Sequence, residues 1–187
     1  MKFNKHYELE GAHAFLSPSG YHWLNYSPEK LMAVRSNKLA VEKGTELHAI
    51  AESLIKNKIK LPKSSKTLNA YVNDAIGYGM SPEVVLYYSR HCFGTADSIL
   101  FDEKKSLLRI HDLKTGTTPA HMEQLEIYTA LFCLEYGVRP SEIEMELRIY
   151  QFDEKQIFIP SSEDIVPKID IIVSHSALLD QLEEKEN

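Results

Sequence analysis

The feature that most constrains the fold is a change of hydrophobic period near the middle of the chain. Before about residue 80 the apolar residues recur at helical spacing, most clearly over Val41–Lys58. Short runs rich in β-branched, aromatic and aliphatic residues follow, a pattern typical of strands. These runs are Val84–His91, Thr95–Phe101 and Leu107–Leu113. The sequence therefore predicts helices first and a β-sheet afterwards.

The remaining elements alternate between the two patterns. The charged run Asp102–Lys105 predicts a hairpin turn between the second and third strands. Further helices are expected over Pro28–Lys38 with Ser27 as N-cap, from Thr67 to about Gly79, over Pro119–Tyr136 ended by Gly137, and over Ile165–Leu182. Another strand is expected over Ile143–Phe152, with a short partner at Gln156–Ile159. This order predicts one α/β domain over residues 1–187, with a mixed central β-sheet flanked by α-helices.

Composition limits the class of protein. The chain has 187 residues, of which 43% are hydrophobic and 26% charged, as in a soluble protein with one core. No apolar run is long enough to span a bilayer, and the N-terminus has no signal-peptide core, so we expect a cytoplasmic location and no membrane partner. The net charge of −6 counts against binding DNA by charge alone, but is compatible with a local basic groove.

The two cysteines exclude some metal centres. Cys92 and Cys133 are too few for a cysteine-only zinc site or a four-cysteine iron–sulfur cluster. In a reducing cytoplasm a disulfide is not expected, so both are predicted to be buried small hydrophobic residues.

The most informative residues lie on the second and third strands. Asp97 is near the start of one strand and Asp112 near the end of the other, so antiparallel pairing would bring both carboxylates to one edge of the sheet. Side chains alternate along a strand, so Lys114 shares the face of Asp112, and Leu113 points into the core with its carbonyl left at the site.

Phosphodiester hydrolysis requires residues of these types. Mg²⁺ and Mn²⁺ prefer oxygen ligands, including carboxylates. Such an ion polarises a phosphate and lowers the pKa of bound water, and a neighbouring lysine can position or deprotonate the attacking water. Taken alone, an Asp-x-Lys triplet also fits a solvated surface hairpin.

Two helices offer further candidates. Gln124 and Tyr128 are four residues apart and share a helix face, which would face the metal site, face substrate phosphate, or be an ordinary polar flank. His48 lies in another helical stretch, after Gly44 and Thr45, with Glu52 one turn later. A lone helical histidine is more often structural than a ligand.

The order of these motifs resembles a known family. His48, then Gly94-x-x-Asp97, then Asp112-x-Lys114, then Gln124-x-x-x-Tyr128 resembles the RecB-like branch of the PD-(D/E)xK nuclease superfamily. That branch includes helicase-linked recombination nucleases, CRISPR adaptation nucleases and many phage nucleases. The segment from His13 to Asn25 is similar to the opening of a phage and prophage group, although Ser27 stands where that group has cysteine.

The resemblance implies a restriction-endonuclease-like core and a role for each matched residue. His48, Asp97, Asp112 and the Leu113 carbonyl would ligate Mg²⁺ or Mn²⁺, and Lys114 would be the catalytic lysine. Gln124 and Tyr128 would support the site or bind DNA. Relatives also carry an acidic residue on the strand before the Gly-x-x-Asp motif, and Glu83 is the nearest candidate. No iron–sulfur cluster is expected.

The expected activity is metal-dependent hydrolysis of DNA in phage replication, recombination or processing, by an enzyme with Asp97, Asp112, Lys114, Gln124 and Tyr128 as its catalytic residues. DNA is the expected partner, with phage recombination or replication proteins as further candidates. The alternatives are a non-catalytic DNA-binding or assembly module on the same fold and a hydrolase of another phosphate ester. Exonuclease or endonuclease mode, polarity and oligomeric state stay open.

Overall fold

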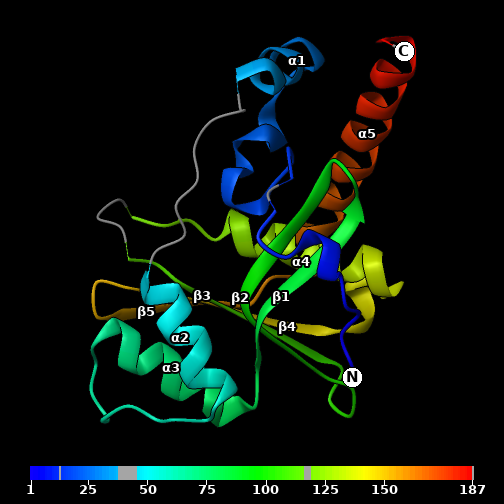
Figure 1. Ribbon diagram of the computed structural model, residues 1–187. Helices are drawn as coiled ribbons and strands as arrows, with labels where there is room; N and C mark the ends of the chain where they lie inside the picture. Colours follow the sequence, from blue (N-terminus) through cyan, green and yellow to red (C-terminus); the bar gives the residue numbers. More distant parts are fainter. Residues whose placement is uncertain (13, 38–45, 116–118, 187) are drawn as a thin grey trace.

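A five-stranded sheet forms the centre of the molecule. The computed structural model describes residues 1–12, 14–37, 46–115 and 119–186 (Figure 1). The strand order is β1-β2-β3-β4-β5, with β3 and β4 parallel and the other neighbouring pairs antiparallel. The predicted α/β class, a mixed sheet flanked by helices, is confirmed.

The strands agree with the sequence expectation in number and order. Their bounds are Ser81–Ser89 (β1), Cys92–Asp102 (β2), Leu107–Leu113 (β3), Glu144–Gln151 (β4) and Glu154–Phe158 (β5). The predicted turn between β2 and β3 is present.

Two predicted strand starts are wrong in a way that matters for the site. β1 begins at Ser81 and not at Val84, because pairing with β2 extends to Ser81↔Ile99. Pro82 is compatible with this because β1 lies at the edge of the sheet. β2 begins at Cys92, so Asp97 lies in the middle of this strand and not near its start.

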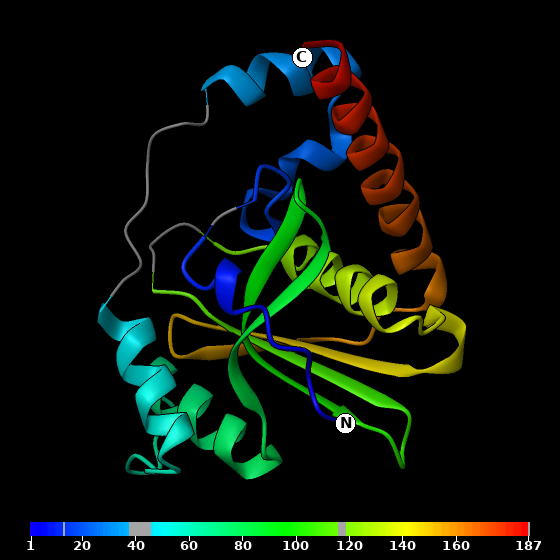
Figure 2. The same cartoon turned by 45° about the vertical axis from the view of Figure 1, so that its right-hand side comes forward.

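One face of the sheet is covered by α4 and α5. The parallel pair β3–β4 requires a crossover connection, and α4 (Glu123–Tyr136) lies within it. α4 packs on β1 and β3, and α5 (Ser162–Glu186) packs against α4 (Figures 1 and 2). Leu108 and Ile110 of β3 are fully buried in the core on this side.

The bounds of α4 differ from the expectation at its start, and those of α5 differ at both ends. α4 begins at Glu123 and not at Pro119, because the preceding segment is held by a tertiary contact: the Ala120 N–H donates to the Gln151 side chain at 2.9 Å. Its end at Gly137 is as predicted, with a φ of 64°, a left-handed conformation that favours glycine. α5 begins at Ser162 and not at Ile165, and it continues beyond Leu182 through the acidic end of the chain to Glu186.

The opposite face is covered by α3, with α2 packed beside it. α2 spans Glu46–Lys56 and α3 spans Thr67–Tyr78. Leu113 of β3 packs with residues of both helices in a second core cluster, as strand alternation predicted. The predicted start of α2 at Val41 lies outside the described residues. Its predicted end at Lys58 is wrong, because Lys58 adopts a left-handed φ of 55°.

The N-terminal segment folds over β2 and α4. It contains 3-10 helices at Tyr7–Leu9 (η1) and Pro18–Asn25 (η2), followed by α1 at Pro28–Asn37. The Lys30 N–H donates to the Ser27 hydroxyl at 3.3 Å, which agrees with Ser27 as N-cap. None of the described helices is long and apolar enough to cross a membrane.

Candidate active site

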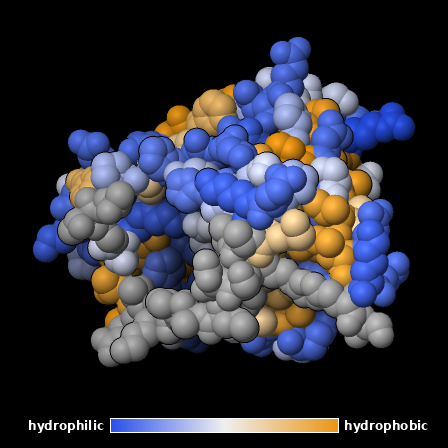
Figure 3. Space-filling model, turned by 90° about the horizontal axis from the view of Figure 1, so that it is seen from above, coloured by the Kyte–Doolittle hydropathy of each residue, from blue (hydrophilic) through white to orange (hydrophobic). Residues whose placement is uncertain are grey.

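The candidate site is a cavity of about 500 Å³ where α2, α4, β1, β2 and the N-terminal segment meet, with Lys114 directly after β3. His48 from α2, Glu83 from β1 and Asp97 from β2 line it, together with Lys114 and Gln124. Seen from above, hydrophilic atoms line part of a hollow in the surface of the molecule (Figure 3). The cavity thus gathers ionisable side chains from elements that are far apart in the sequence.

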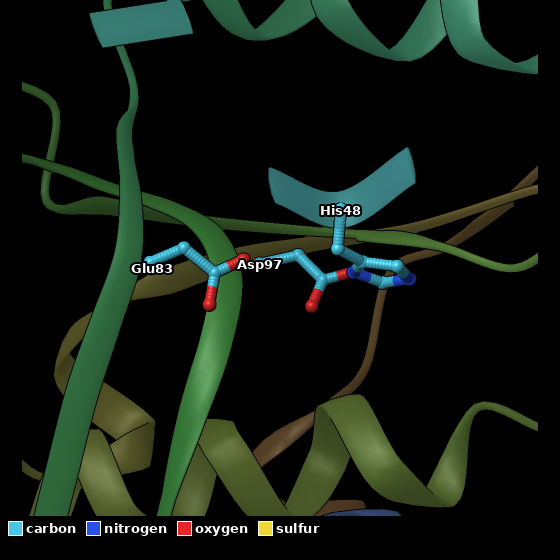
Figure 4. A group of neighbouring side chains, drawn as sticks. All are labelled: His48, Glu83 and Asp97. Atoms are coloured by element: carbon cyan, nitrogen blue, oxygen red, sulfur yellow. The ribbon is translucent and has the colours of Figure 1, made fainter. Parts of the chain in front are cut away.

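Three potential ligands converge in this cavity. One ligand atom each from His48, Glu83 and Asp97 lies within 4.8 Å of the other two. Figure 4 shows the Asp97 carboxylate between the other two side chains. His48 Nδ1 lies 3.5 Å from Asp97 Oδ2.

Sheet register explains why Glu83 and Asp97 meet. The β1–β2 pairing passes from Pro82↔Ser98 to Val84↔Ala96, which places Glu83 opposite Asp97. Glu83 has a φ of 49°, a conformation that is costly for a residue with a side chain. Strained backbone of this kind is concentrated at functional sites, because the surrounding structure must hold it.

The cavity is short of positive charge. Burial and the neighbouring charges of Asp97 and Glu52 raise the pKa of Glu83 to about 7, despite an opposing effect from His48 and Lys56. The hydrogen bond with Asp97 raises the pKa of His48, against the effect of its burial. A cation bound here would favour the ionised carboxylates.

Asp112, Lys114 and Gln124 form a buried chain of contacts beside this cluster. Lys114 Nζ donates to Asp112 Oδ1 at 3.1 Å and to Gln124 Oε1 at 2.6 Å, and Gln124 Nε2 donates to the same Asp112 oxygen at 3.2 Å. Burial, followed by the charge of Asp97, raises the pKa of Asp112 to about 6, with Lys114 opposing the shift. The lysine is therefore held at a fixed place between β3 and α4.

One oxygen in this group of contacts among Asp112, Lys114 and Gln124 has spare acceptor capacity. Asp112 Oδ2 is fully buried, and among the described residues no donor reaches it with hydrogen-bond geometry, although Lys114 Nζ lies 3.0 Å away. A buried carboxylate oxygen normally has a partner. It is thus a further oxygen that could serve a cation.

Asp97 connects the two groups. Its Oδ2 accepts the Leu113 N–H at 2.7 Å and is the atom that faces His48. Because Leu113 follows Asp112, this bond fixes the end of β3 against β2 where the β2–β3 pairing stops at Ser98↔His111. The Asp97 side chain thus belongs to the site and also holds together β2 and β3, the strands that carry Asp97 and Asp112.

Tyr128 and Gly94 shape the wall of the cavity. The Tyr128 hydroxyl donates to the Thr95 carbonyl, so α4 is fixed to β2 two residues before Asp97. A Cβ added at Gly94 would lie 2.6 Å from Pro18 Cδ and 3.2 Å from the Tyr128 ring. Gly94 is therefore required by the close approach of η2 and α4.

The donor set fits a divalent cation. Ligand atoms on one Mg²⁺ or Mn²⁺ ion lie up to about 4 Å apart, since each bond is just above 2 Å. The three atoms within 4.8 Å of one another would reach this arrangement by small movements of their side chains. Two carboxylates suit Mg²⁺ and Mn²⁺, and the imidazole favours the transition metal of the two.

The structure brings together most of the residues that the sequence singled out. His48, Asp97, Lys114, Gln124 and Tyr128 line one cavity. Asp112 lies directly behind it, in contact with Lys114, and Leu113 contributes its N–H to Asp97. The predicted role of the Leu113 carbonyl stays a prediction, and His13, Gly44 and Thr45 lie outside the described residues.

Glu83 is the site residue that the sequence placed least well. The strand was expected to begin one residue after it, which left this carboxylate in a loop. The available signal was its position opposite Asp97 once β1 is extended back to Ser81. That extension depends on pairing with β2, which a single strand pattern does not contain.

Comparison with known proteins adds a weak likeness to a solved structure. No protein-family model and no curated protein matches this chain. A solved structure of a phage related exonuclease from Haemophilus somnus 129PT is similar with a TM-score of 0.43 and 11% sequence identity, over 96% of this chain and 100% of that chain. A likeness of this degree assigns neither a family nor an activity to the chain.

Proposed function

We propose that this chain is a divalent-metal-dependent nuclease that hydrolyses phosphodiester bonds in DNA. The observation that carries the proposal is the cluster of His48, Glu83 and Asp97 beside the Asp112–Lys114 pair. The sequence resemblance to RecB-like PD-(D/E)xK nucleases supports the same activity through the order of the same motifs.

Four side chains would form the metal site. His48, Glu83, Asp97 and Asp112 would hold Mg²⁺ or Mn²⁺, with the Leu113 carbonyl as a further ligand implied by the resemblance. The bound ion would supply polarisation of the scissile phosphate and a lowered pKa of water.

Lys114 is the proposed catalytic lysine. Asp112 and Gln124 hold its amine in place, so its charge is aimed without a reorganisation cost when negative charge develops on the phosphoryl oxygens. The same amine can hold or accept a proton of the attacking water. Tyr128 would act as a positioning residue, because its hydroxyl fixes β2 beside Asp97.

DNA is the proposed substrate, and phage replication, recombination or processing is the proposed setting. Labelled single-stranded DNA, duplex DNA and RNA, each incubated with Mg²⁺, Mn²⁺ or EDTA, test the proposal. We expect cleavage of DNA that EDTA abolishes. Binding of DNA without cleavage in either metal would instead support a non-catalytic module, and hydrolysis restricted to small phosphate esters would contradict a nuclease.

A further inference from the structure

A second cavity lies next to the candidate active site. It measures about 290 Å³, and Lys114 lines both cavities. Its walls are mainly apolar and come from four elements: Leu47 of α2, Leu68 of α3, Leu113 of β3 and Phe152 of the β4–β5 turn. Phe152 is 55% exposed at its edge.

Phe152 is held in a conformation that its residue type disfavours. The turn has two residues between the paired Gln151 and Glu154, and Phe152 and Asp153 have φ values of 55° and 60°. Such a turn favours Asn or Gly, because both central residues need positive φ. A bulky aromatic residue at this place is an outlier.

The start of α3 maintains the turn. Asp153 Oδ1 accepts the Thr67 N–H at 2.7 Å and the Thr67 hydroxyl at 3.0 Å, and the Asp153 N–H donates to the same hydroxyl at 2.7 Å. Both ribbon views show the β4–β5 turn beside α2 and α3 (Figures 1 and 2). The strained turn thus presents an exposed ring at the mouth of an apolar cavity.

We propose that this cavity receives one nucleobase of the DNA strand, next to the phosphate that is cleaved. The inference rests on the proposed function, because it takes the substrate strand to pass Lys114. A base in the apolar cavity would leave its own phosphate beside Lys114, the residue that lines both cavities. The exposed Lys66, which precedes Thr67, adds positive charge at the same edge.

The size and walls of the cavity fit this occupant. Its volume is at the lower limit of the roughly 300–1,000 Å³ of small-molecule pockets, so it has room for one ring system. Aromatic side chains bind bases through their faces without sequence preference, since every base has a π-face. The cavity would therefore fix the position of the DNA strand without distinguishing one base from another.

The test begins with Phe152→Asn. Asparagine tolerates positive φ, so this variant should melt at or above the wild-type temperature while lacking the ring. We expect its DNA dissociation constant in Ca²⁺, measured by fluorescence anisotropy, to rise by about 5–150-fold, the range for loss of one base–aromatic contact. Phe152→Trp should bind like wild type. Ile157→Asn, an equally exposed apolar position on β5, is the matched control and should also bind like wild type.

A series of labelled DNA oligonucleotides, each with one base replaced by an abasic analogue, identifies the occupant. In Mn²⁺ the wild-type enzyme should cleave poorly at the phosphate next to the missing base, wherever that base is placed. Cleavage by the Phe152→Asn enzyme should not depend on where the missing base is placed.

The outcomes separate this inference from the proposed function. Wild-type cleavage that ignores abasic positions, together with unchanged DNA affinity of Phe152→Asn, would overturn the base-binding cavity and leave the nuclease standing. A wild-type protein that neither binds nor cleaves DNA would overturn both.

Discussion

Among single residues, Lys114 is the one on which the proposed catalysis depends most. Lys114→Ala should lower the rate of DNA cleavage by about 10²–10⁴-fold, because it removes a positioned charge or proton acceptor. DNA affinity in Ca²⁺ should change little by comparison. Lys114→Arg should not restore the rate, because a guanidinium cannot deprotonate and has another shape. Lys104→Ala, in the exposed β2–β3 turn, is the control for loss of a lysine. A Lys114→Ala enzyme of near wild-type rate would show that the assignment is wrong.

Glu83 is predicted to be a metal ligand. Glu83→Gln keeps the size of the side chain but removes one charge from the cluster, so the affinity for Mn²⁺ measured by calorimetry should fall at least about tenfold, as loss of metal-site partners does. His48→Ala should weaken binding in the same way. Glu144→Gln changes an exposed glutamate on β4 and should bind Mn²⁺ like wild type. If Glu83→Gln and wild type bind the ion equally, the cluster in Figure 4 is not the ion site.

Residues whose positions follow from local backbone geometry were predicted correctly, and those that depend on a partner strand were not. Strand alternation correctly placed Asp112 and Lys114 on one face, with Leu113 in the core, because the period of a strand is fixed by backbone geometry. Glu83 was misplaced because its position depends on a partner strand. Its left-handed φ also breaks the local preference on which sequence prediction relies.

At the scale of elements, Gly94 tests the packing of η2 and α4 on β2. Gly94→Ala adds a Cβ at 2.6 Å from the rigid Pro18 ring, so it should destabilise the fold by about 1–3 kcal/mol in urea unfolding. Gly77→Ala meets nothing within 4 Å and lies inside α3, so it should stabilise by about 0.5–1 kcal/mol. Equal stabilities for the two variants would contradict the close approach.

Asp74 tests the contact of α3 with β4 and β5. Its Oδ2 accepts from the Tyr150 hydroxyl at 2.6 Å and from Lys155 at 2.8 Å, and it pairs with the buried Arg148 at 3.2 Å. Burial opposes ionisation, but these contacts outweigh it and lower the pKa of Asp74. Asp74→Asn should therefore destabilise the protein at neutral pH by about 1–3 kcal/mol, reduced from the cost in a fully buried pair because Asp74 is partly exposed.

The same contact predicts a pH dependence. A carboxyl with a lowered pKa in the folded state contributes stability above its unfolded pKa of about 4, and this contribution is lost as the pH falls through the folded pKa. The stability difference between wild type and Asp74→Asn should therefore shrink below about pH 4. The exposed Asp170→Asn should stay within about 0.5 kcal/mol of wild type throughout. A difference that is constant with pH would contradict the ion-pair account.

Elements were predicted well in type and order, and less well at their ends. β3 was predicted with its observed bounds, and α3 and α4 end at glycines in the left-handed conformation, which local sequence encodes. The starts of β1 and α4 were misplaced because both are set by tertiary contacts, the pairing with β2 and the Gln151 side chain. The sequence predicted a mixed sheet but did not predict that β3 and β4 are its parallel pair, since no local pattern states strand order.

At the scale of the whole molecule, the site combines acidic side chains with a chain of net charge −6. Such a protein repels DNA over long distances unless cations or local lysines offset its field. The metal would therefore serve binding as well as chemistry, and cleavage should depend steeply on the ion.

The most direct test of the central claim is single-turnover cleavage of end-labelled DNA at saturating enzyme while Mn²⁺ is titrated. We expect cleavage that rises with Mn²⁺, disappears in EDTA, and is lost in Asp97→Asn and Asp112→Asn proteins that retain the wild-type melting behaviour. Cleavage that persists in EDTA or in both variants, or a wild-type protein that leaves DNA intact at every Mn²⁺ concentration, would contradict it.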